Sequence, residues 1–148
     1  MKLIKALKIK NRVAGDLARA QEIFRRENSR RDDDSSKVDR TEAWNVISSK
    51  KAELIRIKTA ITKANVGIYH ALAEMEELKG MIRYVQLLDT REGEEVSYEG
   101  MNAQKVTYVW TAQLNQEAVD GLITHYQNRL NELQDEVDEY NATTDVEI

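Results

Sequence analysis

The sequence predicts a mainly α-helical protein, an antiparallel bundle of about four long helices with a β-hairpin inserted between the third and the fourth. Apolar residues recur with helical spacing along most of the 148 residues, and the chain contains no Pro and few aromatic residues. One stretch before the last helix alternates instead as a strand does. The length fits a single helical domain, residues 1–148, that can bury a core of its own.

The clearest predicted helix spans residues 115–140. Asn115 stands where an N-cap is expected, and Glu117 suits the positive end of the helix dipole. The apolar side chains step by four and three residues, which places them on one heptad seam. The seam consists of Val119, Ile123, Tyr126, Leu130, Leu133, Val137 and Tyr140. A seam this long requires partner helices.

Three earlier helices are predicted at about 2–28, 41–64 and 68–88, each with an apolar stripe on one face. Residues 65–67, Asn-Val-Gly, are either a turn between the second and third helices or a kink in one longer helix. Gly15 within the first helix is expected to mark a close helix crossing.

Residues 29–40 are expected to form a mobile loop, because oppositely charged and small polar residues follow one another there. A candidate anion contact lies beside and within this loop, made of Arg25, Arg26, Arg30 and Arg31. The three consecutive Asp residues that follow would oppose a polyanion, and they lack the spacing of a calcium-binding loop.

The hairpin is predicted over about 94–112, with a short first strand, a longer second strand and a turn at residues 100–102. A lone two-stranded hairpin is marginal in water. We therefore expect it to lie on the helices or to pair its edge with another subunit. Tyr98, Tyr108 and Trp110 are the candidate oligomer contacts, and packing within the monomer is the alternative for all three.

Charge is distributed unevenly. Residues 1–31 contain ten Lys and Arg against three Asp and Glu, whereas residues 114–148 contain one against nine. The favoured interpretation is that the basic first helix lies beside the acidic last helix, within one chain or between subunits. A basic arm that binds nucleic acid or anionic lipid is the alternative.

The sequence shows no catalytic signature. There is no Cys and no glycine-rich phosphate loop, and neither His70 nor His125 has a carboxylate three residues before it, as the metal-binding motif of helical bundles requires. The many carboxylates fall on the expected outer faces of helices. We expect no enzyme activity, no metal, no cofactor and no small-molecule substrate.

Four short segments resemble a bacterial family labelled septicolysin-like, and together they span nearly the whole chain. They are Lys2-Leu3-x-x-Ala6-Leu7, Ile61-Thr62-Lys63-Ala64-Asn65, Lys105-Val106-Thr107 and Asn141-Ala142-Thr143-Thr144-Asp145. The resemblance implies a long-helix protein with a small β insertion, and the label implies an oxygen-independent haemolysin. It supplies no catalytic residues. The first loop departs from the family, because its arginines and Asp triplet replace a stretch rich in Glu and Pro.

The expected function is therefore that of a non-enzymatic structural or interaction protein that self-assembles as a homo-oligomer through its helices and the hairpin edge. The N-terminal segment lacks the apolar core of a signal peptide, which predicts a cytoplasmic location. A membrane-active protein, as the family label implies, is the second hypothesis. Nucleic-acid binding by the first helix is the third and is disfavoured.

Overall fold

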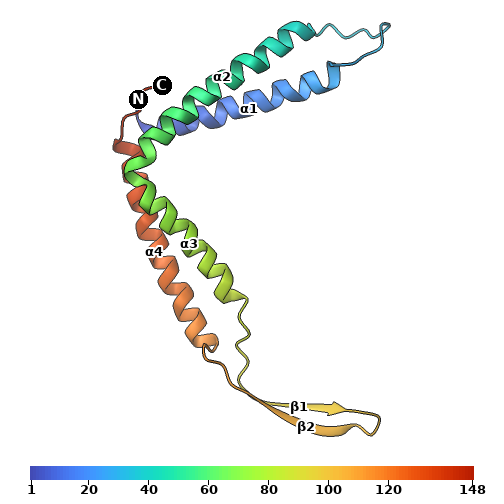
Figure 1. Ribbon diagram of the computed structural model, residues 1–148, viewed down its shortest axis with the longest axis vertical. Helices are drawn as coiled ribbons and strands as arrows, with labels where there is room; N and C mark the ends of the chain where they lie inside the picture. The colour runs from blue at the N-terminus through green and yellow to red at the C-terminus, as the bar shows by residue number, and fades with distance from the viewer. The chain divides into compact units, whose positions relative to one another are not determined.

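The computed structural model describes residues 1–148 and confirms a mainly helical protein with an antiparallel hairpin directly before the last helix (Figure 1). The elements in chain order are α1 (Leu3–Glu27), α2 (Arg40–Ala64), the 3₁₀ turn η1 (Asn65–Ile68), α3 (Tyr69–Gln86), β1 (Gly93–Glu99), β2 (Gln104–Trp110) and α4 (Gln116–Thr143). The Asn115 side chain accepts a 2.9 Å hydrogen bond from the Ala118 amide, which confirms the predicted N-cap of α4.

The predicted second and third helices are joined. Residues 40–86 form one helical segment of 47 residues, in which η1 connects α2 to α3. Ala64, Asn65 and Tyr69 all have right-handed helical backbone angles, so the chain does not turn back at this point. Of the two alternatives for residues 65–67, the structure therefore shows the continuous helix, locally tightened to a 3₁₀ turn.

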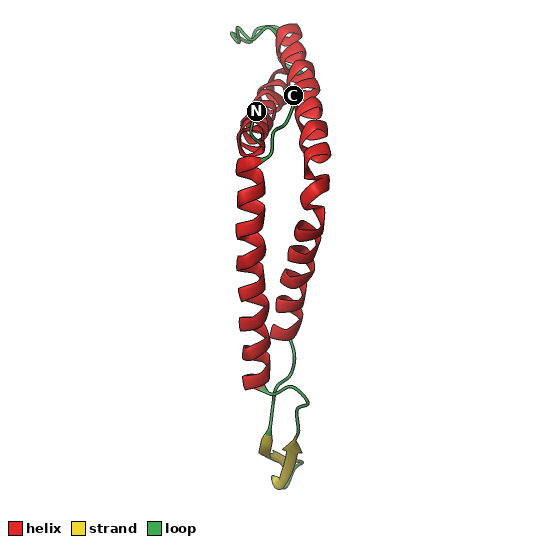
Figure 2. Ribbon diagram, turned by 90° about the vertical axis from the view of Figure 1, so that its left-hand side faces the viewer, coloured by secondary structure: helices red, strands yellow, loops and turns green.

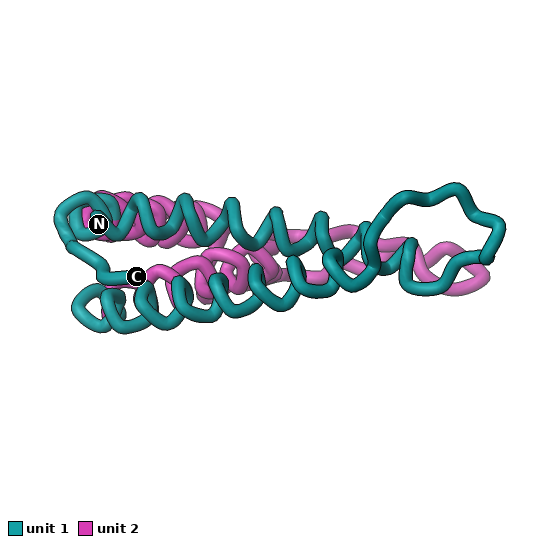
Figure 3. The backbone as a smooth tube through the Cα atoms, turned by 90° about the horizontal axis from the view of Figure 1, so that it is seen from above, with its two compact units in different colours: residues 1–69, 138–148 teal, residues 70–137 magenta.

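The chain divides into two compact units, shown in different colours in Figure 3. Unit 1 comprises residues 1–69 and 138–148, and unit 2 comprises residues 70–137. The last helix begins in unit 2 and ends in unit 1, and the long helical segment crosses the same boundary in the opposite order. Each unit is described by itself below.

Unit 1 is a hairpin of two long helices, α1 and α2, which run side by side (Figures 1 and 3). Its core cluster consists of Leu3, Ala6, Val13, Ile57, Ile61 and Val146. The C-terminal tail supplies Val146, which is 4% exposed. Lys2 forms an isolated β-bridge with Asp145, and the two side chains pair at 2.9 Å. These contacts hold the chain's two ends together within the unit.

The loop between α1 and α2 covers residues 28–39 and is held by local polar contacts. The Arg30 guanidinium donates to the carbonyl oxygen of Val38 at 3.1 Å, and the Ser36 hydroxyl donates to Glu27 at 2.7 Å. The Asp39 side chain accepts from the Glu42 amide at 3.0 Å and caps α2. The predicted start at Thr41 is therefore corrected by one residue, because the Asp carboxylate takes the capping position.

Unit 2 contains α3, the first part of α4 and the hairpin, and α3 and α4 run side by side (Figure 2). The buried residues are Ala71, Met75 and Val85 on α3, and Val119, Leu130, Leu133 and Val137 on α4. Leu133 is completely buried. Arg129 on α4 donates to both carboxylate oxygens of Glu74 on α3, at 2.7 and 3.0 Å, and so links the two helices.

The hairpin strands pair antiparallel in continuous register, from Gly93 opposite Trp110 to Glu99 opposite Gln104. Both strands have seven residues, so the prediction that the second is longer is wrong. The first strand starts earlier than predicted because Gly93 pairs with Trp110 and Glu94 pairs with Val109 at the end of the second strand. No residue of either strand is buried, and the hairpin extends past the ends of α3 and α4 (Figure 2).

Candidate interaction surfaces

The seam of α4 faces the interior of the chain. Of the seven predicted residues, Val119, Leu130, Leu133 and Val137 are buried, and Ile123, Tyr126 and Tyr140 are partly buried. Residues up to Val137 belong to unit 2, whereas Tyr140 packs against the core of unit 1. The chain's own elements therefore cover most of this seam.

One face of the hairpin is covered by polar contacts between side chains. The Trp110 indole donates to Glu95 at 2.7 Å, and the Arg91 guanidinium stacks over the same ring at 3.7 Å. The Tyr108 hydroxyl donates to Glu99 at 2.8 Å. This contact and the nearby carboxylate charge raise the pKa of Tyr108 above its ordinary value.

The opposite face of the hairpin is exposed, and its apolar side chains alternate with Glu94, Lys105 and Thr107. Val96, Tyr98 and Val109 alternate onto this face and are 47%, 68% and 69% exposed. Met101 in the turn is fully exposed. The three predicted contact residues are thus divided: Tyr98 lies on this face, which we call the apolar hairpin face, and Tyr108 and Trp110 lie on the other.

Unit 2 also has a hollow between the end of α3 and the start of α4. Its volume is about 440 Å³, and its lining is mainly apolar and aromatic. The lining includes Tyr84, Leu88, Leu114, Leu122 and Tyr126. Tyr84 is 59% exposed and the neighbouring Leu87 is 85% exposed. Two helices have no third element to cover these side chains within the unit.

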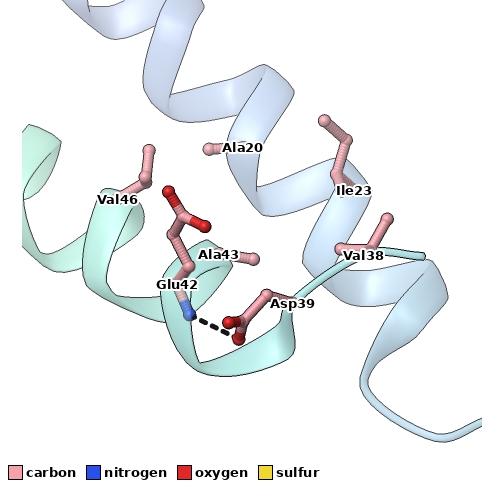
Figure 4. A pocket seen from close by; sticks show the side chains of 7 residues that line it. All are labelled: Ala20, Ile23, Val38, Asp39, Glu42, Ala43 and Val46. Carbon is pink, nitrogen blue, oxygen red and sulfur yellow. Dashed lines mark hydrogen bonds between the residues drawn. The ribbon is translucent and has the colours of Figure 1, made fainter.

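A second hollow, of about 250 Å³, lies in unit 1 where α1, the loop and the start of α2 meet (Figure 4). Ala20, Ile23, Val38, Ala43 and Val46 form its apolar lining. The hydrogen bond between Asp39 and Glu42, drawn in Figure 4, closes one side. Outside this hollow, Trp44 contacts Phe24 with ring centroids 5.1 Å apart and remains 53% exposed.

Each arginine of the candidate anion contact has a carboxylate partner. Arg25 makes a two-pronged contact with Glu22, which also attracts Arg26 at 3.8 Å. Arg30 pairs with Glu27 at 3.2 Å, and Arg31 pairs with Asp33. The Arg25 guanidinium holds the pKa of Glu22 below its ordinary value. An incoming anion would have to compete with these carboxylates, and anion binding at this place stays a prediction.

The histidines lie apart from any cluster of ligands. His70 Nε2 is 3.2 Å from a carboxylate oxygen of Glu136, and this contact links α3 to α4 within unit 2. His125 contacts the ring of Tyr126 at 5.9 Å between centroids. No group of three or more His, Cys, Asp or Glu side chains in the chain has the arrangement of a metal site.

Sequence reasoning missed three polar contacts, Arg129 with Glu74, Trp110 with Glu95 and Tyr108 with Glu99. The hairpin contacts depend on register, because Glu95 and Glu99 share a face with the aromatics of β2 only once Gly93 is paired with Trp110. The Arg129 contact depends on how α3 and α4 align. Arg129 is the single Lys or Arg after residue 113, and this isolation was the one feature of the sequence that could have indicated the contact.

No helix of the chain is both long enough and apolar enough to cross a membrane. No protein-family model matches the sequence, and neither the curated proteins nor the solved structures include a significant match.

Proposed function

We propose that the protein is a non-enzymatic, cytoplasmic structural or interaction protein that acts as a homo-oligomer, with the apolar hairpin face as one of its contacts. The observation that supports it is a hairpin with two unpaired strand edges and three exposed apolar side chains, Val96, Tyr98 and Val109, on one face. Unpaired edges and uncovered apolar side chains favour pairing with another chain.

A second copy of the chain is the partner that suits these features. The two edges of the hairpin can each extend into a neighbouring sheet, and a neighbour would bury Val96, Tyr98 and Val109. Burial of a Val side chain contributes on the order of 1.5–3 kcal/mol, so a few such residues decide whether copies associate. A two-stranded sheet also gains stability when a third strand joins it.

Light scattering at micromolar concentration tests the proposal. The wild-type chain is expected to have a mass at least twice its 17.0 kDa. The double variant Tyr98→Lys/Val109→Lys is expected to lose mass, because it places two charges on the apolar hairpin face. The matched control is Ile55→Lys/Val66→Lys, which changes two similarly exposed residues outside the hairpin. A monomeric wild-type protein would contradict the proposal.

Membrane activity is the second candidate, and the turn of the hairpin favours it. Met101 is fully exposed and Tyr98 lies nearby, so the hairpin presents an apolar and aromatic tip that suits the interface of a bilayer. The resemblance to septicolysin-like proteins points the same way. Vesicles of phosphatidylglycerol and phosphatidylcholine filled with a self-quenched dye test this candidate, with Met101→Asp as the variant. Absence of both binding and dye release excludes it.

A further inference from the structure

The outer face of α1 carries a row of unpaired cations, which we call the basic stripe, made of Lys5, Lys8 and Arg12. Their spacing of three and four residues places them on one side of the helix, opposite the buried Leu3, Ala6 and Val13. All three are exposed, and none takes part in an ion pair. Like charges at this spacing repel one another, so the stripe destabilises the free helix slightly.

The surroundings of the basic stripe leave room for another helix. Gly15 follows Arg12 by about one turn, and a Cβ atom built there would meet nothing within 4 Å. Ile4 borders the stripe and is 44% exposed. The close helix crossing predicted at Gly15 is therefore not made inside the chain, although the surface is open to one.

The last helix carries the opposite charge near its C-terminal end. Asp135 and Glu139 are exposed, lie one turn apart on one side of α4, and take part in no ion pair; we call them the acidic stripe. The nearby Glu132 and Glu136 are in contact with Arg129 and His70, and no Lys or Arg follows Arg129. The acidic stripe points away from the seam that contains Leu133 and Val137.

The ion pairs of the arginines on α1 are made within α1: Arg19 pairs with Asp16, and Arg25 and Arg26 pair with Glu22. Lys2 is the residue at the start of α1 that reaches the C-terminal tail, where it pairs with Asp145. The basic stripe and the acidic stripe are thus complementary in charge, and none of their five side chains takes part in an ion pair. A second copy brings both stripes at equal concentration.

We infer that the basic stripe of one copy docks on the acidic stripe of a second copy, with α1 and the neighbour's α4 antiparallel. An antiparallel arrangement also places the helix dipoles favourably. The inference rests on the proposed self-assembly and adds the surfaces that set its specificity, since charge complementarity selects partners and register more than it raises affinity.

Two charge-reversed variants test the inference. Lys5→Glu/Lys8→Glu/Arg12→Glu reverses the basic stripe, and Asp135→Lys/Glu139→Lys reverses the acidic stripe. Each alone is expected to raise the apparent dissociation constant of self-association by about 100-fold or more, because like charges then face each other. An equimolar mixture of the two is expected to regain wild-type association, measured by sedimentation velocity. The control Lys51→Glu/Lys58→Glu/Lys63→Glu makes the same change of net charge on exposed positions of α2 and is expected to associate as wild type.

The wild-type protein provides a test that needs no variant. Raising NaCl from about 50 mM to about 500 mM shortens the screening length several-fold and is expected to weaken association by about tenfold or more. Circular dichroism melting of every variant confirms that each one is folded. Failure of the mixture to associate, or salt-insensitive association of the wild type, overturns the inference.

The outcomes separate this inference from the proposal on which it rests. If the hairpin variant dissociates while both charge-reversed variants associate as wild type, self-assembly stands and the docking of the stripes is wrong. If the wild type is a monomer, both are wrong. If the basic-stripe variant loses binding to an arbitrary DNA duplex or to anionic vesicles and keeps its wild-type mass, the stripe serves a polyanion, and the inference is overturned.

Discussion

The hydroxyl of Tyr140 donates a hydrogen bond of 2.7 Å to the backbone carbonyl oxygen of Ala64, a residue 76 positions earlier in the chain. Ala64 is the last residue of α2, where the helix tightens into the 3₁₀ turn η1. A side chain that enters the hydrogen-bond ladder of a helix is a known cause of such local irregularity. Tyr140 therefore marks the place where the end of α4 meets the middle of the long helical segment in unit 1.

Gly67 and Tyr140 form a steric pair that predicts non-additive mutations. A Cβ atom at Gly67 would lie 2.5 Å from the Tyr140 hydroxyl oxygen and 3.2 Å from the ring carbon that bears it. Gly67→Ala is therefore expected to lower the free energy of unfolding by about 1–3 kcal/mol. Tyr140→Phe is expected to cost about 1 kcal/mol, because the Ala64 carbonyl loses its hydroxyl donor.

The double variant separates the steric effect from a loss of helix geometry. Without the hydroxyl, the closest remaining contact is the one of 3.2 Å to the ring carbon, which is tight but needs a much smaller adjustment, so Gly67→Ala in the Tyr140→Phe background is expected to cost less than in the wild type. Urea unfolding followed by circular dichroism measures the four free energies of the cycle. Additive free energies would show that Gly67 is required for its backbone and not for the space that Tyr140 occupies.

The link between Arg129 and Glu74 predicts that Arg129 contributes more to the stability of the protein than Arg83 does. Arg129 bonds to both oxygens of Glu74 and also to Glu132 at 3.1 Å. Arg129→Ala is expected to lower the melting temperature more than Arg83→Ala does, because Arg83 is an exposed residue of α3 with no ion pair. Differential scanning calorimetry checks this order, and equal effects would mean that the two-pronged contact contributes nothing measurable.

The same contact predicts a dependence of stability on acid. The Arg129 guanidinium lowers the pKa of Glu74 below its ordinary value of 4.5. A lowered folded pKa means that the contribution is complete above the unfolded value and is lost as the pH falls through the folded value. The melting temperature of the wild type is therefore expected to fall below pH 4.5 more steeply than that of Glu74→Gln, which has no titrating group at this position. Parallel pH profiles would contradict the assignment.

The turn of the hairpin contains a strained residue. Ala103 has a φ of 48°, in the left-handed region that costs an L-residue roughly 1–2 kcal/mol, and its amide donates to Gly100 at 3.2 Å. Ala103→Gly is expected to relieve most of this strain and to slow hydrogen exchange in β1 and β2. Ala112→Gly, a change outside the turn, is the matched control. Unchanged exchange rates in Ala103→Gly would show that the turn conformation does not limit the hairpin.

Side-chain spacing predicted the elements well where one period dominates. The seam residues of α4 are all buried or partly buried, and the hairpin lies before the last helix. The continuity at residues 65–68 could not be decided, because an Asn-Val-Gly sequence suits both a turn and a helix, and the Tyr140 hydroxyl that accompanies the 3₁₀ turn comes from a distant part of the chain. The start of α2 was placed one residue too late because Asp39 and Thr41 are both good caps.

For the candidate surfaces too, some features follow from local sequence and others depend on the fold. Exposure of the arginines near the first loop could be expected from their position, but their pairing with Glu22, Glu27 and Asp33 depends on rotamers and on the path of the loop. Alternation along β2 is enough to place Tyr108 and Trp110 on one face of the hairpin. Which face is covered by Glu95 and Glu99 depends on the strand register.

The sequence by itself determined the helical class, the hairpin and the charge asymmetry, because these depend on local period and on composition. The tertiary structure decided that α1 packs on α2 and that α3 packs beside α4. The physical reason is that an amphipathic helix specifies which face it buries but not which helix covers that face. Partner choice depends on contacts between residues far apart in sequence, such as Tyr140 with Ala64 and Arg129 with Glu74.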